Sequence, residues 1–128
     1  MGDDISLDQE KKETFLKEKI FDGLTNLSIG KKIEDYSFSE DDFKQILEKV
    51  KYFGIGIYTM EASVDGQVVK TIIHEKYKKK TTNPKWFLQG FRDLKREFKD
   101  ATYTATYRVS SKLIADKVKK SSEDLVED

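Results

Sequence analysis

The sequence predicts one α+β domain, in which an antiparallel sheet of three or four strands carries helices packed mainly on one face. Three observations predict this class: helical spacing of apolar residues in several stretches, an Asp-Gly hairpin signal, and strict alternation over residues 101–109. A chain of 128 residues can bury a core without disulfides or a metal. We therefore treat residues 1–128 as one domain and expect residues 1–5 and 121–128 to be loose tails.

Two helices are predicted in the first half of the chain. A capping box at residues 6–9 precedes a helical stripe of apolar side chains, which indicates a first helix. Ser39 is a good N-cap for a second helix over residues 40–51, because acids follow it and apolar residues repeat at helical spacing. Residues 25–37 stay open between a fourth strand and a packed loop.

A hairpin follows the second helix. Two β-rich runs, residues 52–64 and 67–77, flank Asp65-Gly66, which predicts a type I′ turn because both central residues of that turn need positive φ. Regular pairing from the turn places Glu61 opposite Lys70, a favourable cross-strand pair. The predicted core face of the hairpin then carries Tyr58, Met60, Ala62, Val69 and Ile73.

The last third of the chain predicts a helix, a strand and a final helix. Asn83-Pro84 is a helix-start signal, and a phenylalanine-rich stripe continues to about residue 98. The alternation over residues 101–109 predicts a half-buried strand with Tyr103 and Tyr107 on one face. Ser110 or the serine after it can cap the final helix.

The formal net charge of the chain is zero, but the two signs are distributed unevenly along it. Residues 1–66 hold 9 Lys or Arg and 15 Asp or Glu, residues 67–120 hold 15 and 5, and residues 121–128 hold 0 and 4. Such a cationic block predicts a local positive field, unless the acidic first half packs beside it and neutralises it. The asymmetry is therefore a compositional indication of an anionic partner.

The positive charge concentrates on one predicted loop and one predicted helix face. Four of the helix cations follow the spacing i, i+3, i+4 and i+7, which places them on a common face. Four aromatic residues would stack on unpaired bases if they were exposed: Tyr77, Trp86, Tyr103 and Tyr107. The alternation favours a core position for Tyr103 and Tyr107. The candidate binding residues are Lys76, Lys78, Lys79, Lys80, Lys85, Arg92, Lys95, Arg96 and Lys99, with the aromatic side chains Tyr77 and Trp86.

Nothing in the sequence indicates catalysis. The chain has no Cys, and its one histidine, His74, has no nucleophile or carboxylate that the sequence places beside it. The paired carboxylates are adjacent in sequence and therefore point apart on a helix or strand. We expect no enzymatic activity, no catalytic residue, no metal site and no small-molecule cofactor.

The functional expectation is a small non-enzymatic interaction module that binds a protein partner, or a second copy of itself, through complementary charged surfaces. The alternative is a nucleic-acid-binding domain that uses the basic loop 76–80 and helix 84–99. The chain opens on Met1-Gly2-Asp3-Asp4, unlike a secretory signal, and has no apolar run near the ~18–20 residues that span a bilayer. We expect a cytoplasmic protein without a membrane partner.

Overall fold

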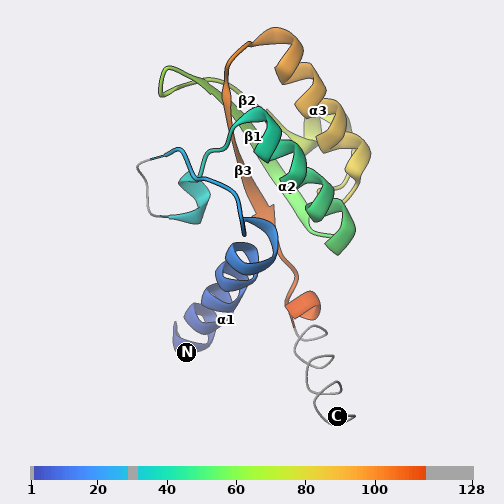
Figure 1. Cartoon of the computed structure of the whole chain (residues 1–128). Helices are drawn as coiled ribbons and strands as arrows, with labels where there is room; N and C mark the ends of the chain where they lie inside the picture. Colours follow the sequence, from blue (N-terminus) through green and yellow to red (C-terminus); the bar gives the residue numbers. More distant parts are fainter. Residues whose placement is uncertain (1, 29–31, 115–128) are drawn as a thin grey trace, which may run out of the picture.

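A three-stranded antiparallel sheet in the order β2-β1-β3 lies at the centre of the structure (Figure 1). Its strands are β1 (Gly56–Val64), β2 (Gln67–Ile73) and β3 (Thr102–Arg108). The computed structural model describes residues 2–28 and 32–114, with side chains from residue 9 onward. The chain has an α+β fold, as the sequence predicts.

Two antiparallel helices, α2 (Glu40–Phe53) and α3 (Pro84–Glu97), cover one face of this sheet (Figure 1). The side chain of Tyr103 in β3 explains this placement, because its ring contacts both helices. It stacks on Phe43 of α2 at a centroid distance of 5.5 Å and meets Phe91 of α3 edge-on at 5.0 Å. The predicted packing of helices on one face is therefore confirmed.

The two covering helices begin where the sequence predicts. The Ser39 hydroxyl accepts a hydrogen bond from the Asp42 backbone N–H at 3.2 Å, which caps α2. The Asn83 side chain accepts one from the Lys85 backbone N–H at 2.9 Å, and Pro84 takes the first position of α3. Each cap satisfies an N–H group that has no partner within its own helix.

The N-terminal part of the chain differs from the prediction in two respects. Helix α1 (Gly2–Phe15) begins before the expected start at Ser6 and includes residues 2–5, for which we expected a loose tail. It continues as a π-helical turn, η1 (Leu16–Ile20). Within the described residues of the stretch 25–37 there is a short 3₁₀ turn, η2 (Ile33–Asp35), and no strand.

The sheet gains only an isolated bridge beyond β3. Phe38 and Tyr103 exchange two backbone hydrogen bonds of 2.9 Å, and this is the one place where the segment before α2 pairs with the sheet in the described chain. The described residues of the stretch 25–37 therefore contain no fourth strand, and residues 29–31 lie outside the described residues. Ser110 caps the final helical turn at residues 111–114, and the expected tail at residues 121–128 lies outside the described residues.

The predicted hairpin turn is correct, but the register beyond it is not. Asp65 and Gly66 have φ values of 53° and 81°, as a type I′ turn requires. After two regular pairs the register shifts, so that Lys70 pairs with Ala62 and Glu61 pairs with Thr71. The cause is a β-bulge, in which β2 contributes one extra residue, Val69.

Two bulges also change the predicted core face. Tyr58 is the extra residue of β1 against β3, and this residue and Val69 are each 43% exposed. Because a bulge reverses the alternation of side chains beyond it, Ile57 and Met60 both reach the core, and Ile72 is buried in the place expected for Ile73. Met60 and Ala62 are buried as predicted.

A close backbone approach at the start of β1 gives a test of the fold. Gly56→Ala is expected to lower the free energy of unfolding by about 1–3 kcal/mol, because an added Cβ would lie 2.6 Å from the Thr81 hydroxyl oxygen and 2.9 Å from its Cβ. Chemical denaturation measures this loss. Adding Thr81→Gly should recover part of it, whereas an unchanged stability of Gly56→Ala would contradict the close approach.

Candidate functional site

The candidate site is built around the buried indole of Trp86. This side chain is 1% exposed, and its Nε1–H donates a hydrogen bond of 3.2 Å to the backbone carbonyl of Ile57 in β1. Its ring centroid lies 5.5 Å from that of Tyr77 and 6.3 Å from that of His74. Trp86 therefore fixes the start of α3 and the segment after β2 to the sheet, and this candidate binding residue has no exposed ring that could stack on a base.

The basic loop follows a short 3₁₀ helix, η3 (His74–Tyr77), where the sequence indicates a continuing strand. Two contacts hold this loop. The Nδ1–H of His74 donates to the carbonyl of Lys79 at 2.9 Å, since a carbonyl can only accept, and the Ile57 backbone N–H donates to the carbonyl of Thr81 at 3.0 Å. Lys76 of η3 and the loop lysines Lys78, Lys79 and Lys80 are all exposed.

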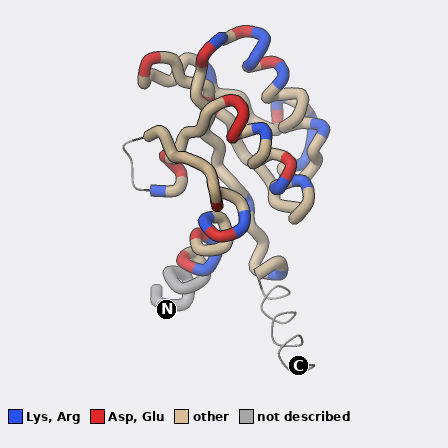
Figure 2. The backbone as a smooth tube through the Cα atoms, in the orientation of Figure 1, with Lys and Arg blue, Asp and Glu red and all other residues tan. Residues whose placement is uncertain are grey.

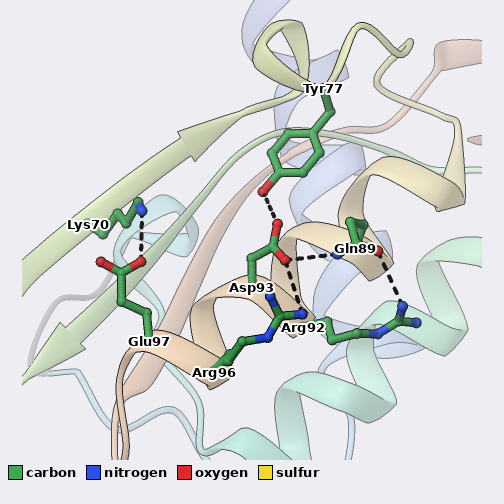
Figure 3. A network of polar contacts seen from close by, with 7 residues as sticks. All are labelled: Lys70, Tyr77, Gln89, Arg92, Asp93, Arg96 and Glu97. Carbon is green, nitrogen blue, oxygen red and sulfur yellow. Dashed lines mark hydrogen bonds and ion pairs between the residues drawn. The ribbon is translucent and has the colours of Figure 1, made fainter.

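Asp93 connects Tyr77, the last residue of η3, to the cations of α3 (Figure 3). Its carboxylate accepts hydrogen bonds of 2.8 Å from the Tyr77 hydroxyl and from the Gln89 side-chain amide. A guanidinium nitrogen of Arg96 lies 3.7 Å from the same carboxylate, and Arg92 donates to the Gln89 side-chain oxygen at 3.2 Å. One carboxylate thus binds Tyr77 of η3 and Gln89 directly and lies near Arg96, while Arg92 is linked to it through Gln89.

The pKa values of this pair reflect their contact. The hydrogen bond from Tyr77 is the largest influence on Asp93 and holds the pKa of its carboxyl group below the ordinary value. Burial, followed by the hydrogen bond to Asp93, raises the pKa of Tyr77 from 10.0 to about 12. The two groups therefore stabilise each other in the states that predominate at neutral pH, a carboxylate and a protonated phenol.

Ion pairs between the predicted cations and the acidic first half are absent from the described residues. Within residues 9–28 and 32–114, no carboxylate from before residue 67 makes an ion pair with any of the nine candidate lysines and arginines. The carboxylate paired with Arg96 belongs to α3 itself, and Lys95 lies over the Phe91 ring at 4.6 Å. Figure 2 shows Lys and Arg gathered along α3 and the acidic start of α2 beside it.

We call this set the cationic surface. The side chains of eight members are exposed, and that of the ninth, Lys95, is half-buried. They lie on η3, on the loop after it, on α3 and just beyond the end of α3. Its residues are Lys76, Lys78, Lys79, Lys80, Lys85, Arg92, Lys95, Arg96 and Lys99.

The aromatic side chains considered for base stacking do not lie on this surface. Tyr103 is fully buried, and Tyr107 is half-buried with its ring against Phe21. The hydroxyl oxygens of both tyrosines are buried without a hydrogen-bond partner in the described part of the chain, and burial raises both pKa values. The predicted core position of this strand face is therefore confirmed, and a stacking platform is not available.

A groove of about 840 Å³ lies where α1 and η2 meet the end of β3, away from the cationic surface. Its lining mixes both signs of charge over a partly apolar floor, so neither sign dominates there. The charged residues that line it are Lys12, Glu13, Lys32, Glu34 and Arg108.

His74 has a structural contact rather than a catalytic constellation. Among the described residues its hydrogen bond goes to the carbonyl of Lys79, and no carboxylate accepts from its ring. The same residues contain no group of three or more His, Cys, Asp or Glu placed to hold a metal ion. None of the helices in the described residues combines the length and apolar character that a bilayer crossing needs.

The comparisons with known proteins give no relative: no family model, no curated protein and no solved structure matches this chain.

The Tyr77–Asp93 contact predicts a measurable alkaline transition. The protonated phenol stabilises the fold, so its contribution is fully present below the ordinary pKa of 10.0 and is lost as the pH rises through about 12. Phenolate absorbance of the wild type minus that of Tyr77→Phe should show a midpoint near 12. Asp93→Asn should move that midpoint towards 10.0, and a wild-type midpoint already at 10.0 would contradict the contact.

Proposed function

We propose that this domain is a non-enzymatic interaction module whose cationic surface binds an acidic surface of a protein partner. The observation that carries the proposal is the absence of ion pairs to the five lysines between residues 76 and 85 within the described chain. Exposed charges that the fold does not use for its own pairing are available to steer and orient a partner.

One feature favours a protein partner over nucleic acid. The aromatic side chains near the cations are buried or engaged, so base stacking, which supports binding of single strands, has no exposed residue here. A second copy of the chain is one acidic partner, because α2 begins with three adjacent acids.

Charge reversal on the loop tests the proposal. The triple variant Lys78→Glu, Lys79→Glu, Lys80→Glu should bind a labelled polyglutamate peptide about tenfold or more weakly than the wild type, because three attractive contacts become repulsive. Fluorescence anisotropy at about 50 and 200 mM salt measures the affinity, and the wild-type affinity should fall as salt rises.

The matched control changes the same charge elsewhere. Lys17→Glu, Lys19→Glu and Lys44→Glu are exposed positions outside the cationic surface, and together they should leave the polyglutamate affinity nearly unchanged. Equal losses in the two triple variants would show dependence on net charge alone and contradict the proposal. Binding of a random single-stranded oligonucleotide without binding of polyglutamate would favour nucleic acid instead.

A further inference from the structure

The outer edge of the sheet next to the cationic surface has no partner strand. Strand β2 pairs with β1 alone, and its other edge makes no backbone hydrogen bond to any described residue. Its side chains are exposed from Gln67 to Thr71. After the bulge at Val69, the stretch Lys70–Ile73 pairs regularly with β1 and is therefore a straight template for one more strand.

A groove of about 540 Å³ runs beside this edge, between β2 and α3 (Figure 3). Lys70 and Ile72 reach into it from β2, because alternate side chains of a strand share a face. Leu94 is its buried apolar neighbour on α3, so the groove has apolar side chains on both walls. The remaining lining residues are Tyr77, Asp93, Arg96 and Glu97.

The charged side chains that line the groove form two ion pairs, and both are exposed to solvent. Lys70 Nζ lies 2.8 Å from a carboxylate oxygen of Glu97, and the two side chains are 43% and 49% exposed. Arg96 lies 3.7 Å from Asp93, with its own side chain 71% exposed. Ion pairs as exposed as these contribute little to stability, so an arriving carboxylate can replace an internal one at either cation.

We propose that an extended peptide alternating acidic and apolar residues adds to β2 as a fourth strand along Lys70–Ile73. Its backbone would complete the free edge, and its acidic side chains would enter the groove towards Lys70 and Arg96. The apolar side chains would then lie on the other face of the sheet, on the side of Ile73. This inference rests on the proposed function and specifies the form of the acidic partner.

The lysine loop beside the groove favours this occupant over a basic or neutral peptide. The charged residues that line the groove balance, with Lys70 and Arg96 against Asp93 and Glu97. The lysine loop begins where β2 ends, so one end of a bound acidic strand would meet additional positive charge. Glutamate suits the groove because its carboxylate can meet Lys70 or Arg96, the two cations that line it. Lysine in the same place would oppose Lys70 and Arg96.

Backbone N-methylation separates strand addition from simple charge attraction. The probe is a seven-residue peptide of alternating Glu and Val, blocked at both ends, titrated into the isotopically labelled full chain. Two controls carry N-methyl groups on every second backbone nitrogen, in the two possible phases. We expect the unmodified peptide to shift the backbone amide signals of residues 70–73, and at least one methylated form to bind about tenfold or more weakly.

A charge variant supplies a second, independent readout. Lys70→Glu should weaken binding of the unmodified peptide, whereas Lys17→Glu, an exposed change of the same charge outside the groove, should not. Because Lys70 is exposed and its ion pair lies at the surface, the variant is expected to keep the fold, which the amide spectrum verifies.

The outcomes distinguish this inference from the proposed function. Equal binding of the unmodified peptide and both methylated peptides, with shifts at residues 76–85, would overturn strand addition and leave an acidic partner on the cationic surface. Binding of polyglutamate without binding of the alternating peptide would do the same. If neither probe binds at about 50 mM salt, the inference and the proposed function both fail.

Discussion

The structure depends most on one buried side chain, Trp86, at the point where α3, the segment after β2 and the central strand meet. Its hydrogen bond to the carbonyl of Ile57 ties the start of α3 to β1. Its ring packs near His74 and Tyr77, whose own bonds hold the lysine loop and connect it to Asp93. A polar indole N–H that finds its acceptor inside the core places these elements uniquely, because an unsatisfied donor there would be costly.

Local chemistry explains why much of the fold was predictable. The Ser39 and Asn83 caps, the Asp65-Gly66 turn and the strand β3 each depend on a few neighbouring residues, and each is present as predicted. The bulges at Tyr58 and Val69 were not predictable in this way, because an extra residue is accommodated by packing from other elements. The strand that was predicted to continue through His74 also differs, because it ends at Ile73 and η3 begins at His74.

The candidate site was also predictable only in part. Charge counting identified the cations, because lysine and arginine remain exposed whatever the detailed packing. It listed Trp86 among the candidate binding residues, although an aromatic residue beside an apolar helical stripe is a signal for burial, and the side chain is buried. It also omitted Asp93, an acid in the middle of the basic row, whose contact with Tyr77 needs two segments to meet in space. Interactions between distant segments are what the sequence pattern does not contain.

The central claim is that the cationic surface keeps its positive field in the folded chain. Paramagnetic relaxation of backbone amides by a cationic and an anionic nitroxide of similar size measures the local potential at each residue. The anionic probe is expected to relax the amides of residues 76–85 and 92–99 more strongly, and the order should reverse at the acidic start of α2, Glu40–Asp42. Equal relaxation by both probes along the lysine loop and α3 would contradict it.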